Sequence, residues 1–409
     1  MGTIAIVGGG ASGLACAIAA KKANPKARVL VFERLERVGK KILSTGNGRC
    51  NFTNREISPQ YYKSRDMESL SNILADLPTD FVPDFFSQLG LMSTEEEKGR
   101  IYPYSFQASS VMDVLLLALN RLGVELKCSC EITRLSYEKA CFTLFTNSGE
   151  TFTADRLVLS SGGLASGVRL GCDGQGFRLA KFFGHSLEKL YPCLVPFRCN
   201  MENLGGLKGI RSQGVLSLYS GEKLLGCEEG EIQFTEYGLS GIPAMDLSNL
   251  MVDEKSPYEL HIDLFPRLEV SELQSLFKSR AKDYGNLSLE MLFTGLINKR
   301  LGFAVLKSLG ISPLSRPCSS LSSQEISRLG ETLKAWRFPV SGTLGWDKAQ
   351  VSGGGVPLEE IEPNTMESRR RSGLFLTGEM LDVVGNCGGY NLHWAWSSGI
   401  LAGRAAAKF

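Results

Sequence analysis

Three glycines and one acid near the N-terminus have the types and the spacing that bind a dinucleotide. The glycines follow a short apolar strand, residues 4–7, in the order Gly8-x-Gly10-x-x-Gly13. Gly8 allows a tight turn, Gly10 lets a pyrophosphate approach the backbone, and Gly13 lets a helix pack closely on the strand. Glu33 ends the next strand, where a carboxylate accepts hydrogen bonds from ribose hydroxyls. The pattern therefore predicts a site for an adenine dinucleotide.

A βαβ unit must position these residues. A helix of small residues, 14–23, follows the turn, and a second apolar strand leads into Glu33. The helix N-terminus offers free N–H groups and the positive end of a dipole to the phosphates. We expect Ala11 and Ser12 to contact the dinucleotide at the start of this helix, and Arg34 to contact it beyond the acid.

The composition of the whole chain excludes several classes of protein. The 409 residues are 43% hydrophobic and 22% charged, with a net charge of +2, which fits neither a disordered chain nor a strongly basic nucleic-acid-coating protein. No apolar run approaches the roughly 20 residues of a membrane helix. The 11 cysteines form no CxxC pair, and the apolar N-terminal stretch is already a strand rather than an export signal. We therefore expect a cytoplasmic protein with reduced thiols, no membrane segment and no metal site.

Only one glycine fingerprint is present, so the single site must hold the cofactor that stays bound. Three segments favour FAD over NAD. Residues 38–51 supply glycines, backbone N–H groups and cations to a phosphate-rich ligand. Residues 374–379, Leu-Phe-Leu-Thr-Gly-Glu, place a carboxylate beside the ribityl chain. Residues 388–396 begin the terminal helix, whose N-terminus stabilises the negative charge of reduced flavin at N1–C2=O.

The remaining predicted FAD contacts lie in these segments and in the strands that return to the cofactor. They are Lys40, Lys41, Gly46, Asn47, Arg49, Asn51, Ile132, Ser160, Gly162, Gly378, Glu379, Gly389, Asn391 and Leu392. Because no second nucleotide fingerprint is visible, NAD(P)H is expected to dock transiently as the reductant.

Hydrophobic patterning predicts the elements around the site. Apolar runs and turn residues predict strands at 124–132, 141–147, 155–163 and 374–378, with short alternating strands after about residue 190. Helical spacing predicts helices at 271–280, 288–309 and 323–334, and a terminal helix within 388–409.

These elements indicate an α/β protein with an interrupted dinucleotide domain. We expect a three-layer, Rossmann-like FAD-binding domain formed by residues 1–189 and 346–409. An inserted β-barrel-like domain is expected at residues 190–266 and 335–345, and a small inserted helical domain at residues 267–334.

Four segments carry a resemblance to a known family, at residues 39–51, 171–177, 234–241 and 381–391. Their sequences are GKKILSTGNGRCN, GCDGQGF, FTEYGLSG and LDVVGNCGGYN. The chain resembles, nearly from end to end, the BaiN/RdsA family of bacterial NAD(P)/FAD-dependent oxidoreductases. The resemblance implies tightly held FAD, a three-part architecture and reductive chemistry. Members are linked to saturating a uridine of large-subunit ribosomal RNA and to bile-acid steroid reduction.

Reduction of an activated C=C bond needs a donor to the substrate carbonyl and a source of a proton. Arg49 could bind the flavin pyrimidine edge or a substrate carbonyl, or else a phosphate or a surface acid. Cys50 could act as the acid, or could be a small buried residue in a tight loop. Tyr237, which the family pattern brings over the flavin, could donate to a carbonyl or could pack at the rim.

The expected activity is hydride transfer from NAD(P)H through FAD to a conjugated C=C bond. A uridine of large-subunit ribosomal RNA is the leading substrate, and a steroid enone comes next, because both conjugate C=C with C=O. An alternative is a flavin oxidase, or a peroxidase that uses Cys50; a structural or sensing role for FAD is weaker. Lys299, Arg300, Lys307 and Arg316 could contact RNA phosphates or form a solvated face.

Overall fold

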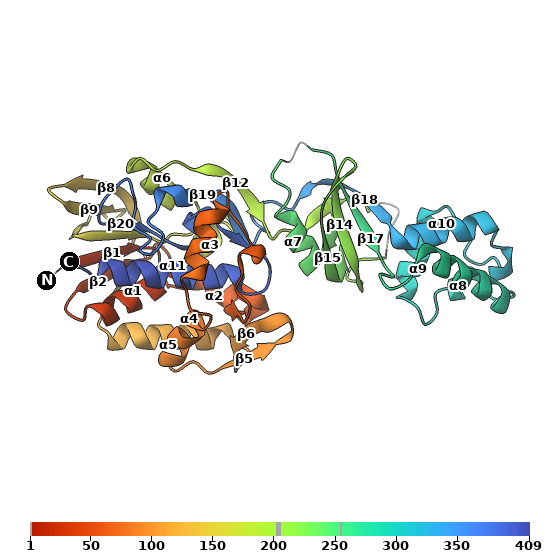
Figure 1. Ribbon diagram of the computed structural model, residues 1–409, viewed down its shortest axis with the longest axis horizontal. Coiled ribbons are helices and arrows are strands. Elements are labelled where there is room, and N and C mark those ends of the chain that lie inside the picture. The colour runs from red at the N-terminus through yellow and green to blue at the C-terminus, as the bar shows by residue number, and fades with distance from the viewer. Residues whose placement is uncertain (1, 202–205, 254–255) are drawn as a thin grey trace. The chain divides into compact units, whose positions relative to one another are not determined.

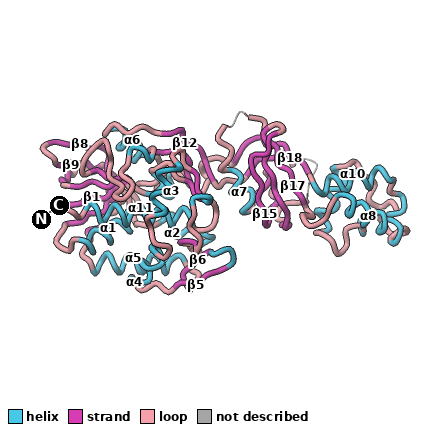
Figure 2. Tube along the Cα trace, viewed as in Figure 1, coloured by secondary structure: helices cyan, strands magenta, loops and turns pink. Residues whose placement is uncertain are grey.

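The computed structural model describes residues 2–201, 206–253 and 256–409. The chain folds into two compact units (Figure 1, Figure 2). The first unit comprises Met1–Cys193 and Gln350–Phe409, and the second comprises Leu194–Ala349. The second unit is therefore an insertion into the first.

A five-stranded parallel sheet forms the centre of the first unit. Its strands lie in the order β20 (Leu374–Leu376), β11 (Arg156–Leu159), β1 (Thr3–Val7), β2 (Arg28–Phe32) and β7 (Glu125–Lys127). Successive residues of β1 and β2 are buried, because both faces of the sheet are covered. Continuous apolar runs rather than alternating ones are the sequence signature of such strands.

Layers on both faces cover this sheet (Figure 1). Helices α1 (Ala11–Ala23), α5 (Ala108–Arg121) and α11 (Tyr390–Ala406) form one layer. An antiparallel sheet of β8 (Ile132–Glu138), β9 (Cys141–Thr146) and β10 (Thr151–Ala154) forms the other. Phe152 of β10 meets Phe32 of β2 with ring centroids 5.0 Å apart. The predicted three-layer Rossmann-like fold is confirmed.

Small residues hold α11 against α1. A Cβ atom at Gly399 would lie 2.2 Å from the carbonyl oxygen of Ser12, and one at Gly403 would lie 2.3 Å from that of Cys16. Glycine is thus required where the two backbones touch. This contact ties the C-terminal helix to the helix that follows the glycine turn.

Shorter helices and strands complete the first unit. The strands pair into two- and three-stranded sheets, β12–β19, β21–β4 and β3–β6–β5. The elements are α2 (Lys40–Ser44), β3 (Thr53–Asn54), β4 (Tyr62–Lys63), α3 (Met67–Ala75), α4 (Phe81–Gln88), β5 (Ser93–Glu96), β6 (Arg100–Pro103), α6 (Gln175–Phe182), β12 (Glu188–Cys193), β19 (Val351–Gly355) and β21 (Val384–Gly385).

The second unit contains a closed barrel and a group of helices that share one hydrophobic core. The barrel strands, in order, are β13 (Phe197–Cys199), β16 (Gly238–Ser240), β15 (Lys223–Phe234), β14 (Arg211–Ser220), β17 (Tyr258–Asp263) and β18 (Trp336–Thr343). The helices are α7 (Ile242–Ser248), α8 (Val270–Asp283), α9 (Lys299–Ser308) and α10 (Ser323–Lys334). The inserted barrel is confirmed, whereas the exact boundaries of three separate domains stay a prediction.

Two predicted elements are wrong. Residues 124–132 do not form one strand: β7 joins the parallel sheet, Ser129 adopts a left-handed turn with φ 53°, and β8 begins at Ile132. Residues 288–309 do not form one helix, because the chain turns at Gly295 with φ 78° and only α9 follows. Among the described residues, no helix has both the length and the apolar character needed to cross a bilayer.

Candidate functional site

The glycine turn lies between β1 and α1. Gly8 has φ 113°, and its carbonyl oxygen accepts a hydrogen bond of 3.0 Å from the Ser160 hydroxyl. A Cβ atom at Gly13 would lie 2.0 Å from the same carbonyl oxygen, so Gly13 is needed for packing. A Cβ atom at Gly10 would meet no protein atom within 4 Å. Gly10 therefore borders open space at the N-terminus of α1, where a pyrophosphate has room to bind.

The Glu33 carboxylate is fixed beside this turn. One oxygen accepts from the Gly9 N–H at 2.9 Å, and the other accepts from the Leu35 N–H at 2.8 Å. Burial raises the pKa of Glu33, and these backbone hydrogen bonds partly oppose that shift. Because a carboxylate has about four lone-pair positions, it retains capacity to accept from ribose hydroxyls.

Arg34, an expected FAD contact, directs its side chain to residues 168–173. Its guanidinium forms an ion pair with Asp173 and donates to the Val168 carbonyl at 3.2 Å. Asp173 also accepts from the Gln175 N–H at 3.0 Å, and the Gln175 side chain donates to the Ile132 carbonyl at 3.3 Å. Asp173 and Gln175 belong to the 171–177 motif, which was the available signal for them.

Lys41 and Glu379 come together from opposite ends of the chain. Their ammonium and carboxylate groups are 2.6 Å apart, and the second carboxylate oxygen accepts from the Ser352 N–H at 2.9 Å. Burial lowers the pKa of Lys41, but attraction to Glu379 and Cys172 outweighs it and leaves the pKa raised. The neighbouring Lys40 instead contacts Glu36 at 3.3 Å.

Left-handed residues shape the loop after α2. Gly46, Asn47 and Cys50 have φ values of 54°, 55° and 56°, and Gly48 has φ 84°. A Cβ atom at Gly48 would meet no protein atom within 4 Å. Backbone N–H groups in such turns can converge on an anion.

Arg49 is held by aromatic rings rather than left free. Its guanidinium carbon lies 4.5 Å from the ring centroid of Tyr102 and 4.6 Å from that of Phe106. It also contacts Glu96 at 2.9 Å, and its side chain is 42% exposed. These contacts fit the surface ion pair that the sequence left open; binding of a carbonyl by Arg49 stays a prediction.

Cys50 is completely buried. Burial raises the pKa of its thiol to about 11, with a partly opposing hydrogen bond to Thr45. The thiol is therefore uncharged near neutral pH. A peroxidase needs an accessible thiolate, so this environment does not favour that alternative.

An unpaired acceptor lies beside the start of α11. The Oδ1 atom of Asn51 is buried and has no hydrogen-bond partner among the described residues. A Cβ atom at Gly389, which precedes α11 and has φ 95°, would lie 2.9 Å from this atom. By contrast, the Asn391 side chain has protein partners at both ends of its amide: it donates to the Gly385 carbonyl at 2.7 Å and accepts from the Gly385 N–H at 2.8 Å.

His393 lies near the start of α11 and is buried. Its Nδ1 lies 2.7 Å from the Thr53 hydroxyl oxygen. Burial lowers the pKa of His393 to about 3, so the imidazole is neutral at physiological pH. We interpret His393 as a structural link between α11 and β3, because its ring contacts Thr53 of β3.

The groups of the first unit fit FAD. The open space at Gly10 and at Gly162 leaves room for the cofactor backbone. The Asn51 oxygen is an unpaired acceptor suited to the flavin N3–H, and Glu33 is an acceptor suited to ribose hydroxyls. The N-terminus of α11 supplies the positive end of a 17-residue helix.

Four other residues predicted to contact FAD lie at the following places in the first unit. A Cβ atom at Gly378 would lie 2.7 Å from the Ser12 hydroxyl oxygen, so these two residues are packed together. Ala11 begins α1, and Leu392 packs partly buried against the core of the first unit.

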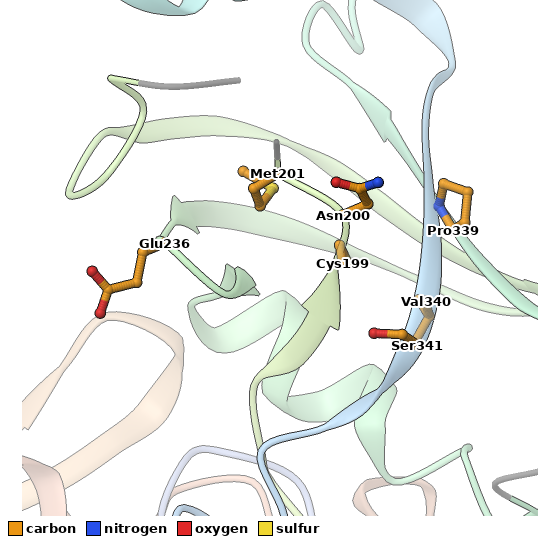
Figure 3. A pocket seen from close by; sticks show the side chains of 7 residues that line it. All are labelled: Cys199, Asn200, Met201, Glu236, Pro339, Val340 and Ser341. Atoms are coloured by element: carbon orange, nitrogen blue, oxygen red, sulfur yellow. The ribbon is translucent and has the colours of Figure 1, made fainter. Parts of the chain in front are cut away.

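Tyr237 belongs to the second unit, whereas the other predicted site residues belong to the first. It is half-buried, and its carbonyl accepts from the Cys199 N–H at 3.0 Å. A cavity of about 530 Å³ lies in this unit (Figure 3). Its lining residues are Cys199, Asn200, Met201, Glu236, Pro339, Val340 and Ser341. Burial raises the pKa of the Cys199 thiol to about 12, so this thiol is uncharged.

Comparison with known proteins identifies relatives of the whole chain. Residues 2–405 match the HI0933-like protein Rossmann domain. The chain is 37% identical over 413 residues to the 3-dehydro-bile acid delta(4,6)-reductase of Clostridium scindens, with 100% of each chain covered. It is 31% identical over 398 residues to the ribosomal RNA dihydrouridine synthase of Escherichia coli, covering 96% of this chain and 95% of that protein.

A solved structure shares the fold. The 3-ketosteroid-delta4-(5alpha)-dehydrogenase from Rhodococcus jostii matches with a TM-score of 0.53 and 17% identity, covering 99% of this chain and 96% of that one. The family match extends over nearly all of this chain, and both curated relatives are covered almost completely. The chain therefore belongs to the HI0933-like family, the BaiN/RdsA family of FAD-dependent oxidoreductases that its motifs resemble.

Proposed function

We propose that this chain reduces a carbon–carbon double bond conjugated to a carbonyl, with FAD as its resident cofactor and NAD(P)H as the transient reductant. One observation carries the proposal: a single compact unit holds a group suited to each part of FAD, from the turn at Gly8 to the helix start at Gly389. When bound, FAD supplies hydride chemistry, accepting hydride from NAD(P)H and delivering it to the substrate carbon.

The first task of the protein is to hold the cofactor extended and rigid. The turn at Gly10 and the N-terminus of α1 bind the pyrophosphate, and Glu33 binds the ribose. The pair formed by Lys41 and Glu379 places one positive and one negative group side by side. We propose that Lys41 contacts phosphate oxygen and that Glu379 accepts from a ribityl hydroxyl.

The second task is to stabilise negative charge at the reacting end. No side-chain hydrogen bond caps the N-terminus of α11 at Gly389, and this end carries the positive pole of the helix dipole. This field is pre-organised, because Asn391 holds the preceding loop at Gly385 and glycines fix α11 against α1. Fixed dipoles of this kind lower the free energy of charge that develops during hydride transfer.

The third task is to bind the substrate and supply a proton. We propose that Tyr237, which the family resemblance implicates, donates a hydrogen bond to the substrate carbonyl. A neutral Cys50 thiol holds a proton, which is the form that an acid requires. Because Cys50 is buried, its thiol could protonate only a substrate atom that enters the loop after α2.

The proposed substrate is a uridine of large-subunit ribosomal RNA. The ribosomal RNA dihydrouridine synthase of Escherichia coli is a relative along nearly its full length. Exposed cations at Lys299, Arg300 and Lys307 of α9 provide a surface that suits phosphates. Arg316 is less suited, because it forms a half-buried ion pair with Glu325 at 2.5 Å.

A steroid enone is the second candidate substrate, and one observation favours it. The relative with 37% identity over the whole chain is a bile-acid reductase. Uracil and an enone both conjugate C=C with C=O, so the same hydride chemistry serves either one.

We propose a cytoplasmic location. The 11 cysteines are free of disulfides, which supports a reducing compartment such as the cytoplasm.

Two measurements test the function. Deleting the gene and mapping dihydrouridine in large-subunit ribosomal RNA should remove one modified site, and the wild-type gene should restore it. In parallel, protein reduced anaerobically by NADH or NADPH should be reoxidised by a steroid enone if the second substrate is right. Unchanged dihydrouridine would contradict the RNA substrate, and a reduced flavin that the enone does not reoxidise would contradict the steroid substrate.

A further inference from the structure

The side chain of Gln175 presents a buried acceptor that no protein group satisfies. Gln175 is the first residue of α6, and its Nε2 atom donates to the carbonyl oxygens of Ile132 at 3.3 Å and Thr133 at 3.4 Å. Its Oε1 atom is buried and has no hydrogen-bond partner among the described residues. A buried acceptor without a partner costs free energy, and a ligand that donates to it would recover that cost.

The orientation of this amide is fixed by its neighbours. Rotating it by half a turn would place Oε1 against two carbonyl oxygens, which cannot donate hydrogen bonds. The rotation would also leave the Nε2 donors of Gln175 buried and unpaired. The unsatisfied atom is therefore an acceptor, and its ligand must offer an N–H or O–H group.

The position of Gln175 relates it to the base end of a dinucleotide. The chain just before β8 lies beside Glu33, the residue suited to bind the ribose. The Cys130 N–H donates to the backbone carbonyl of Glu33 at 2.9 Å. Arg34, next to that acid, pairs with Asp173, which in turn accepts from the Gln175 N–H. Elements β8 and α6 contact each other next to this acid, so a base attached to a ribose at Glu33 would have them as neighbours.

A second unsatisfied atom lies in the same group of residues. The Nε atom of Arg34 is buried and has no hydrogen-bond partner among the described residues, although the rest of its guanidinium is engaged. One buried acceptor and one buried donor thus occur on residues linked through Asp173. A purine base carries both kinds of group along its edges.

We propose that Gln175 recognises the adenine of FAD by accepting a hydrogen bond from the 6-amino group. This inference rests on the proposed function, since it requires that FAD binds along Glu33. Adenine has a donor at C6, whereas hypoxanthine and guanine have an oxygen there. A 6-oxopurine would therefore bring a second acceptor against the Gln175 oxygen, and binding would weaken. Gln175 is a specificity-determining residue for the cofactor.

The test compares FAD with flavin hypoxanthine dinucleotide, which differs at C6 of the base. The full chain is stripped of its flavin and titrated with each cofactor, and binding is followed by the quenching of flavin fluorescence. Wild-type protein should bind FAD at least about tenfold more tightly than the 6-oxo analogue, because one buried hydrogen bond is replaced by opposed acceptors. In Gln175→Met the ratio of the two affinities should fall toward one.

Two controls separate this effect from damage to the fold. Arg178→Met changes an exposed residue of the same helix and should preserve the wild-type ratio. FMN has no adenine, so its affinity should be the same for wild type and Gln175→Met. If Gln175→Met does not fold, a wild-type ratio near one still overturns the role of Gln175.

The outcomes distinguish the inference from the function on which it rests. Equal wild-type affinities for the two dinucleotides, or an unchanged ratio in folded Gln175→Met, would overturn the role of Gln175 and leave the flavin site standing. Failure of wild-type protein to bind FAD and FMN would overturn both.

Discussion

The ammonium of Lys41 contacts the carboxylate of Glu379 at 2.6 Å, although 338 positions separate the two residues in the chain. The side chains are 25% and 17% exposed, so the pair is largely removed from solvent. Attraction within the pair raises the pKa of Lys41 in spite of burial. The pair therefore keeps a cation in place beside the predicted cofactor segments at both ends of the chain.

Replacing Lys41 by methionine should weaken FAD binding. We expect an increase in the dissociation constant of about tenfold to a hundredfold, because a hydrogen bond to a charged group contributes about 1.5 to 3 kcal/mol. Titration of the flavin-free protein with FAD measures this change. Lys26→Met, at an exposed position, is the matched control and should bind FAD as the wild type does. An unaltered dissociation constant in Lys41→Met would remove the pair from the cofactor site.

Two glycines of the turn should respond differently to alanine. Gly13→Ala should destabilise the flavin-free protein by about 1 to 3 kcal/mol, because the new Cβ would overlap the Gly8 carbonyl. Gly10→Ala should change that stability by less than about 0.5 kcal/mol, since φ is −86° and the Cβ meets open space. It should nevertheless weaken FAD binding at least about tenfold, through contact with the pyrophosphate.

Urea denaturation and FAD titration of both glycine variants measure these effects separately. A Gly10→Ala variant that binds FAD normally would show that the open space beside Gly10 is not the pyrophosphate site. A Gly13→Ala variant of normal stability would contradict the close contact with Gly8.

Cys50 should resist thiol reagents in the folded protein. Its thiol is buried, and a pKa of about 11 leaves only about 0.1% thiolate at pH 8. The exposed Cys128 and Cys227 should react first with Ellman's reagent, and mass spectrometry of the digested protein locates the label. The double variant Cys128→Ser/Cys227→Ser should lose this fast reaction. Rapid labelling of native Cys50 would revive the peroxidase alternative.

A buried cluster around Glu360 should make stability depend on pH. Its carboxylate accepts from His185 at 2.6 Å, from Arg370 at 2.9 Å and from the Ser186 hydroxyl at 2.9 Å. Burial raises the pKa of Glu360, but these partners outweigh it and lower the pKa to about 2. For His185, burial lowers the pKa below 6.5 in spite of the carboxylate.

Both shifts destabilise the fold as the pH falls. Because both pKa values are lower in the folded chain, the unfolded chain binds more protons. This holds at His185 below pH 6.5 and at Glu360 between about pH 4.5 and pH 2, so the free energy of unfolding decreases there. Glu360→Gln should lower the free energy of unfolding by about 2 to 4 kcal/mol at pH 7 and flatten its dependence below pH 4.5. Urea denaturation across this range measures both effects. Glu362→Gln, at a 53% exposed carboxylate, should retain the wild-type profile, and an equal loss there would refute a special role for Glu360.

Local patterns predicted the elements that carry strong local signals. The glycine turn and α10 agree with the sequence because turn chemistry and helical spacing depend on adjacent residues. Apolar residues around 288–309 suggested a longer helix, since their spacing does not reveal the left-handed turn at Gly295.

Long-range partners could not be obtained from one sequence. The contact of Lys41 with Glu379 and the burial of His393 depend on how distant segments pack. The sequence placed Lys41 and Glu379 near the cofactor but gave no reason to pair them. Gln175 was visible only as part of a family motif, because the missing partner of its oxygen is a property of the folded chain.

Identification of the flavin in the purified full chain tests the central claim most directly. Protein is isolated, its visible absorption spectrum is recorded, and the cofactor released by heat is identified and quantified by mass spectrometry. We predict a yellow protein that carries one FAD per chain and that loses its colour when NADH or NADPH is added without air. Folded protein that is colourless and fails to take up added FAD would contradict this prediction.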